Sequence, residues 1–159
     1  KKELNPVTEV TLEKDAYLSM STTQIKGVDT TLRVTKAKLK EGSTLIINEK
    51  ILTTGTQQAK TDFIVSLDGE GASTHVTSRS VAEESSYQEF TSNITGNKKC
   101  YAHVECDAII KEIYAKDVDA NLIHEAAIGK IAGQQLMKLM SLGLSEKEAE
   151  ETIIKGFLK

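Results

Sequence analysis

The first part of the chain consists of short runs in which β-branched or apolar residues alternate with polar ones. Each run is bounded by Gly, Asn, Asp or Lys, and alternation with a period of two is typical of β-strands that bury one face. The runs are VTEVTLEKDAYLSM, TTLRVTKAKL, STLIINEKIL, KTDFIVSL, STHVTSRSV and CYAHVECDAII. This pattern predicts a mainly β region that extends to about Ala120.

The remaining residues follow a helical period instead. The segment AAIGKIAGQQLMKLMSL spaces its apolar residues as one face of a helix does, and Gly143 follows where a glycine commonly ends a helix. The next segment, SEKEAEETIIKGFL, opens with Ser145 and Glu148 at the spacing of a capping box. Two helices joined by the short GLS connection predict a helical hairpin.

A weak internal repeat runs through the β region. Three segments, EGSTLIINEKIL, EGASTHVTSRSV and TGNKKCYAHVEC, begin at Glu41, Glu70 and Thr95, so their spacings are 29 and 25 residues. A repeat of this length is typical of the coils of a β-solenoid, whereas a β-sandwich would show the same short strands. If the coils stack, equal offsets place Ile46, His75 and Cys100 in one column, and Leu52, Val81 and Cys106 in another.

The segment CYAHVECD contains both cysteines of the chain, Cys100 and Cys106. In an unbroken strand, residues six apart point to the same face but lie about 20 Å apart, so the two thiols cannot share one ion. Free cysteine is also among the most frequently buried residue types, which favours two small strand residues over a metal site. Tyr101, His103 and Glu105 fall on the opposite face of this strand.

His124 and Glu125 lie where the β region gives way to the helices. A glutamate at a helix start is favoured by the helix dipole, so this pair is consistent with a capping role. It is also consistent with one imidazole and one carboxylate that hold a metal. The spacings typical of nucleotide-binding loops, nucleophile elbows and zinc proteases are absent from the sequence, which gives no basis for an enzyme.

Composition narrows the class further. The net charge is −3 and the isoelectric point about 5.7, so neither nucleic acid nor an anionic membrane is an expected partner. No apolar run approaches the roughly 20 residues of a membrane span, and the N-terminus lacks the apolar core of a signal peptide. Two cysteines suit a cytoplasmic protein with reduced thiols. The absence of Trp and an aromatic content of 4% disfavour a solenoid enzyme that binds polysaccharide.

The C-terminal sequence resembles the end of the SufB/SufD family, the scaffold subunits of the Suf machinery for iron–sulfur cluster assembly. Upstream, EGASTHVTSRSV and HVECDAII resemble core segments of the same family, so the resemblance extends from about Thr22 onward. The motifs that carry it are the Cys106-Asp107 pair, His124-Glu125-Ala126, Gln135-Leu136, Gly143-Leu144-Ser145-Glu146 with Glu148-Ala149, and Gly156-Phe157.

This resemblance implies a right-handed parallel β-helix core over residues 1–120 and a C-terminal helical domain over residues 121–159. It implies a scaffold that is not itself an enzyme and that works with a SufC-type ABC ATPase, which hydrolyses ATP and docks on the helical domain. A second SufB/SufD subunit would pair with the β-helix core, as a homodimer or a heterodimer. The residues expected to contact the ATPase are Gln135, Leu136, Lys138, Glu146 and Glu150.

The resemblance also implies an iron–sulfur cluster or a persulfide held by Cys100, Cys106, His124 and Glu125, with His75, His103 and Glu105 as further candidates. Two departures stand out. Bacterial SufB chains carry a cysteine between the Cys-Asp pair and the HEA triplet, and none is present here. The chain is also shorter than members of that family, so it is either truncated or part of a compact homologue. A SufD-like adaptor that binds the ATPase without a cluster is therefore the alternative function.

Overall fold

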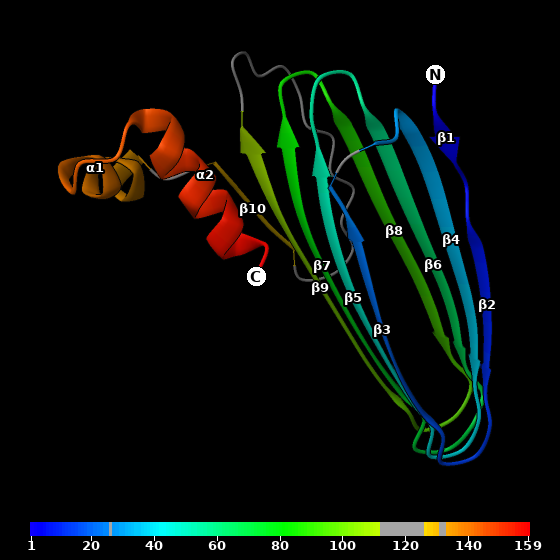
Figure 1. Cartoon of the computed structure of the whole chain (residues 1–159). Coiled ribbons are helices and arrows are strands. Elements are labelled where there is room, and N and C mark those ends of the chain that lie inside the picture. The colour runs from blue at the N-terminus through cyan, green and yellow to red at the C-terminus, as the bar shows by residue number, and fades with distance from the viewer. Residues whose placement is uncertain (26, 112–125, 131–132) are drawn as a thin grey trace.

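The computed structural model describes residues 1–25, 27–111, 126–130 and 133–159. Its strands form two parallel sheets that face each other, and two helices follow the last strand (Figure 1). The first sheet, sheet A, has the order β1-β4-β6-β8 with β2 also paired to β4, and the second, sheet B, has the order β10-β9-β7-β5-β3. Sheet A comprises β1 (Glu3–Leu4), β2 (Val7–Leu12), β4 (Thr30–Leu39), β6 (Gln58–Leu67) and β8 (Tyr87–Gly96). Sheet B comprises β3 (Tyr17–Gln24), β5 (Thr44–Thr53), β7 (Ser73–Glu83), β9 (Tyr101–Lys111) and β10 (Ala126–Lys130).

From β2 to β9, consecutive strands alternate between the two sheets, so each coil of the chain gives one strand to each sheet. Tyr17 pairs with Thr44, Thr44 with Ser73, and Ser73 with Tyr101, which fixes the coil length at 27 to 29 residues. All of these pairings are parallel, whereas β-sandwiches have antiparallel sheets. The predicted parallel β-helix followed by a helical hairpin is thus confirmed as the fold class.

The helical hairpin consists of α1 (Gly133–Ser141) and α2 (Glu146–Phe157). Gly143 has a φ of 96°, a left-handed conformation that suits glycine and ends the first helix. The predicted capping box is confirmed, since the Ser145 side chain accepts from the Glu148 backbone N–H and the Glu148 carboxylate accepts from the Ser145 backbone N–H at 2.8 Å.

The start of the first predicted helix is wrong. Residues 126–130 form β10, which pairs with β9 in the register Ala126 to Cys106, and α1 begins only at Gly133. An edge strand leaves a row of backbone N–H and C=O groups unpaired, and pairing with β10 satisfies those of β9. Sheet B therefore continues past Ala120, while the division of the chain into two domains at that residue stays a prediction.

The columns predicted from glycine spacing are wrong for the third coil. Gly42 and Gly71 lie in turns with φ of 64° and 71°, but Gly96 lies within β8 and pairs with Leu67. Alignment on Gly96 therefore shifts the third coil by three residues. In the observed register His75 pairs with His103 rather than with Cys100.

The second column changes in the same way, since Val81 pairs with Ile109 and Cys106 pairs with Ser78. Strand β8 itself is absent from the predicted strands. Its inward positions alternate Gln88, Phe90, Ser92 and Ile94, and two polar residues in four weaken the apolar signal.

The core lies between the two sheets, where one side chain from each coil stacks on the next. Leu39 and Leu67 from sheet A meet Leu45 and Val76 from sheet B, and all four are fully buried. Phe63 and Phe90 lie beside each other in sheet A with ring centroids 5.6 Å apart. Aliphatic stacking of this kind explains how a chain with few aromatics builds a continuous core.

The turns of neighbouring coils touch so closely that one position requires glycine. A Cβ on Gly69 would lie 1.9 Å from the backbone nitrogen of Glu41 and 2.3 Å from the backbone carbon of Lys40. We expect Gly69→Ala to lower the free energy of unfolding by about 1–3 kcal/mol, because backbone of the preceding coil must move. Urea unfolding followed by circular dichroism measures this change.

Gly156→Ala is the matched control, since a Cβ on Gly156 meets no atom within 4 Å. It replaces a glycine in α2 and should raise the free energy of unfolding by up to about 1 kcal/mol. Equal stability of the two variants would contradict the stacking of the turns.

Candidate functional site

His75 and His103 lie side by side on the outer face of sheet B. They are paired residues of β7 and β9, and adjacent parallel strands bring such side chains within about 5 Å of each other. Their ring centroids are 4.6 Å apart with an interplanar angle of 31°. Both side chains are half-buried, so they are reachable from solvent while their positions are restricted by neighbours.

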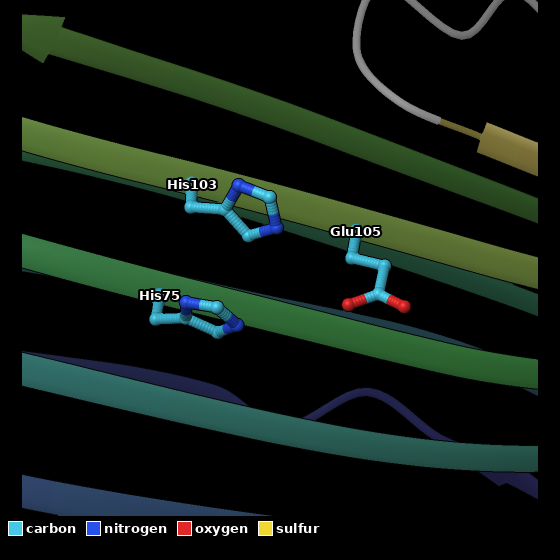
Figure 2. A group of neighbouring side chains, drawn as sticks. All are labelled: His75, His103 and Glu105. Carbon is cyan, nitrogen blue, oxygen red and sulfur yellow. The ribbon is translucent and has the colours of Figure 1, made fainter.

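Glu105 follows His103 by two residues and points to the same face of β9 (Figure 2). One donor atom from each of His75, His103 and Glu105 lies within 4.8 Å of the other two. Among the residues that the structure describes, this is the group of three that combines imidazole and carboxylate donors at such distances. The alternation of β9 places Val104 and Cys106 on the opposite, buried face.

A further carboxylate and a cation continue this surface along the strands. Asp107 is the next outward residue of β9 and pairs with Arg79 of β7. Partial burial raises the pKa of the Asp107 carboxyl, Glu105 adds to the increase by repulsion and a hydrogen bond, and Arg79 opposes it. The outer face of sheet B thus carries two imidazoles and two carboxylates within one short stretch.

Cys106 lies inside the solenoid, with 6% of its surface exposed. Burial raises the pKa of its thiol to about 11, and the nearby Glu49 and Asp107 carboxylates contribute to the increase. The thiolate is the form that attacks sulfur and binds metals, so Cys106 is neutral and unreactive near pH 7 in this conformation.

Glu49 is the unexpected residue of the interior, since its side chain is fully buried. Thr61 donates to its carboxylate at 2.8 Å and Ser78 at 3.1 Å, while the Arg33 Nε lies 3.7 Å away. Burial raises the pKa of Glu49, and the two hydroxyl donors and Arg33 partly offset that increase. Glu49, Ser78 and Cys106 occupy successive positions of one inward column.

Glu49 is not among the candidate residues predicted from the sequence, although the sequence contains a signal for it. In the run TLIINEKIL, strict alternation places Glu49 on the same face as Leu45, Ile47 and Ile51. A carboxylate in such a position is rare unless hydroxyl or cationic partners accompany it. The partners lie on three other strands, β4, β6 and β7, so the local sequence around Glu49 does not reveal them.

The other predicted ligands do not form one site in the described part of the chain. Cys100 immediately precedes β9, is half-buried, and packs against the apolar core. Cys106 faces the interior and lies in the column of Glu49, while His75 and His103 face outward. His124 and Glu125 fall outside the residues that the structure describes.

The residues predicted to contact an ATPase lie on the helical hairpin. Gln135, Lys138 and Glu146 are exposed, whereas Leu136 and Glu150 are half-buried. Three apolar side chains near them are also exposed: Met137, Met140 and Leu142. Among the described helices, none has the length and apolar character needed to cross a membrane.

Comparisons with known proteins relate the chain to one family. Residues 110–157 match the sequence model described as "SUF system FeS cluster assembly, SufBD core domain". An iron–sulfur cluster assembly SufBD family protein of Methanocaldococcus jannaschii is 28% identical over 166 residues, covering 98% of this chain and 52% of the relative. A protein of the same description from Archaeoglobus fulgidus is 30% identical over 193 residues, covering 96% of this chain and 52% of the relative. The chain therefore spans about half the length of these two relatives.

The different surroundings of the two cysteines predict different reactivity. In the folded chain, iodoacetamide should label Cys100 and leave Cys106 unlabelled, because Cys106 is buried and its thiol pKa is about 11. In urea both should react. Trypsin leaves both cysteines in one peptide, residues 100–111, so tandem mass spectrometry of that peptide assigns the label to each cysteine. Equal labelling of the two cysteines in the folded chain would contradict the buried position of Cys106.

Buried Glu49 predicts a pH effect on stability. Folding raises the pKa of Glu49, so between the pKa values of the unfolded and folded states the folded chain keeps a proton that the unfolded chain has lost. Stability therefore falls as the pH rises through that range. Glu49→Gln removes this loss, so the free energy of unfolding of the variant relative to the parent chain should increase as the pH rises above 4.5, the ordinary pKa of a glutamate.

Urea unfolding at several pH values measures this difference. Glu89→Gln is the control, since Glu89 is an exposed carboxylate whose pKa is lowered by Lys60 and Tyr87. It should show no relative gain as pH rises. If the difference in free energy of unfolding between Glu49→Gln and the parent chain did not change with pH, this would contradict the raised pKa of buried Glu49.

Proposed function

We propose that this chain, which belongs to the SufBD family of iron–sulfur cluster assembly proteins, is the part of a scaffold subunit that holds a nascent cluster. The observation that carries the proposal is the similarity to SufBD family proteins over nearly the whole chain. The parallel β-solenoid followed by a helical hairpin supports it, since the C-terminal motifs that resemble SufB/SufD imply this architecture.

The proposed cluster ligands are Cys100, Cys106, His124 and Glu125. Iron–sulfur clusters are held mainly by thiolates, and a set with only two thiols suits a labile cluster that is passed on. Of the two cysteines, Cys100 is the more accessible and is the proposed acceptor of sulfur. Cys106 would have to lose a proton held with a pKa of about 11 before it binds iron.

An ABC-type ATPase of the SufC type is the proposed partner. The chain has no nucleotide-binding loop of its own, so ATP hydrolysis would take place in that partner. The proposed contact surface is the helical hairpin, where Gln135, Lys138 and Glu146 surround exposed apolar side chains. A second subunit of the same family would pair with the β-solenoid.

The second candidate is an adaptor that binds the ATPase and holds no cluster, as a SufD-like subunit would. Two observations favour it. The chain has no cysteine between Cys106 and His124, and Cys106 itself is buried as a neutral thiol.

Anaerobic reconstitution of the full chain with ferrous iron and sulfide, in the presence of its ATPase, tests the proposal. We expect the brown absorbance of an iron–sulfur cluster and co-purification of the two proteins. Alanine at Cys100, Cys106, His124 and Glu125 together should remove most of the bound iron and sulfide, because no thiol remains. The matched control is Glu89→Gln, an exposed change on sheet A that should leave cluster content unchanged.

The two candidate functions give different results in this experiment. Cluster content that is unchanged by the fourfold alanine variant would show that the ligand assignment is wrong. Co-purification with the ATPase without any cluster would favour the adaptor, and absence of both would overturn the proposal.

A further inference from the structure

The group of His75, His103 and Glu105 has no structural task that accounts for its composition. Outward positions of a solenoid face solvent, and neighbouring columns of sheet B carry Thr77, Arg79 and Asn48. The column of the two histidines runs from Ser19 on β3 through Ile46 on β5, so the two imidazoles lie side by side only where β7 and β9 pair. Two stacked imidazoles and a carboxylate are brought together by the register of two coils.

The distances allow a single ion to bind all three side chains. Two ligand atoms that are each about 2.1 Å from one ion lie at most about 4.2 Å apart. The donor atoms of His75, His103 and Glu105 already lie within 4.8 Å of one another. Small side-chain rotations would close the remaining gap, and Figure 2 shows the Glu105 carboxylate beside the two imidazoles, on the same face of the sheet.

The kinds of donor atom identify the class of ion. Two imidazole nitrogens and one carboxylate oxygen form a set that suits iron, cobalt, nickel and zinc as divalent ions, and the same set with open positions is typical of ferrous sites. Calcium and magnesium prefer sets made entirely of oxygen. Because the three side chains are half-buried on an outer face, the remaining coordination positions are open to water and the ion can exchange.

We propose that His75, His103 and Glu105 bind one divalent transition-metal ion on the outer face of the β-solenoid, and that this ion is ferrous iron held before it enters a cluster. The binding site follows from the geometry alone. The assignment of ferrous iron as the cargo rests on the proposed function in cluster assembly. Iron would stay on the outer face while sulfur is bound by a thiol elsewhere in the chain.

Anaerobic titration of the full chain with Co(II), followed by visible absorption, tests the site. A site of nitrogen and oxygen donors gives weak d–d bands, whereas thiolate ligation adds intense charge-transfer absorption in the near ultraviolet. We expect one Co(II) per chain at this site without charge transfer. Equilibrium dialysis with Fe(II) should show binding at the same stoichiometry.

Single substitutions of His75 or Glu105 should weaken the binding of both Co(II) and Fe(II). Changes even to residues around a metal ligand commonly cost 10–100-fold in affinity, so His75→Ala and Glu105→Gln should each weaken binding by at least about tenfold. Both side chains are outward-facing, so circular dichroism should be unchanged. Glu89→Gln, on the outer face of β8 in the opposite sheet, is the control for loss of a surface carboxylate and should bind as the parent chain does.

The same variants also distinguish the proposed metal site from the proposed cluster ligands. At limiting iron, His75→Ala should form cluster more slowly than the parent chain but reach the same final content, because the proposed cluster ligands are intact. Unchanged Co(II) affinity in His75→Ala and Glu105→Gln would overturn the assignment of this site. Loss of Co(II) binding in His124→Ala, but not in these two variants, would overturn it as well. If the parent chain forms no cluster but its metal affinity still depends on His75, the proposed function fails and the site stands.

Discussion

The whole structure depends on the parallel, in-register hydrogen-bond ladder that joins each coil to the next. Because the coils are 27 to 29 residues long, residues far apart in the sequence become direct neighbours. The ladder continues through the turns, where the Gly42 backbone N–H donates to the backbone carbonyl of Glu70 and the Gly71 backbone N–H donates to that of Lys99. Close contact of the turns is what leaves no space for a side chain at Gly69.

This stacking places inward side chains in a buried, mainly apolar environment and outward side chains in contact with solvent. Inward columns are mainly aliphatic, and buried Glu49 is stabilised by Thr61, Ser78 and Arg33, which reach it from three other strands. Cys106 shares that interior and is held as a neutral thiol. On the outer face of the same strand, His103 and Glu105 meet His75 of the preceding coil. Strand β9 therefore has a buried thiol on one face and, on the other, side chains of the kinds that can bind a metal ion.

The local pattern of the sequence predicted what depends on local physics. Alternation identified most of the strands, and the capping box of Ser145 and Glu148 identified the start of α2. The spacing of apolar residues in 126–130 also fits a helical period and so predicts a helix, whereas in the structure these residues pair with the edge of β9 as a strand. The pattern does not reveal the pairing of His75 with His103, because that pairing depends on the length of the turn between Gly96, the last residue of β8, and the start of β9.

The candidate site was predicted as a set of residues rather than as an arrangement. The sequence indicates His75, His103 and Glu105 as candidate ligands, but the glycine spacing places His75 beside Cys100, three residues away from its observed partner His103. An anomalous difference map, measured at the cobalt absorption edge from a crystal of the chain soaked with Co(II), would locate the bound ion. The account predicts one strong peak between β7 and β9, within bonding distance of His75, His103 and Glu105. A map with its only strong peak at the cysteines, or with none on the outer face of sheet B, would contradict it.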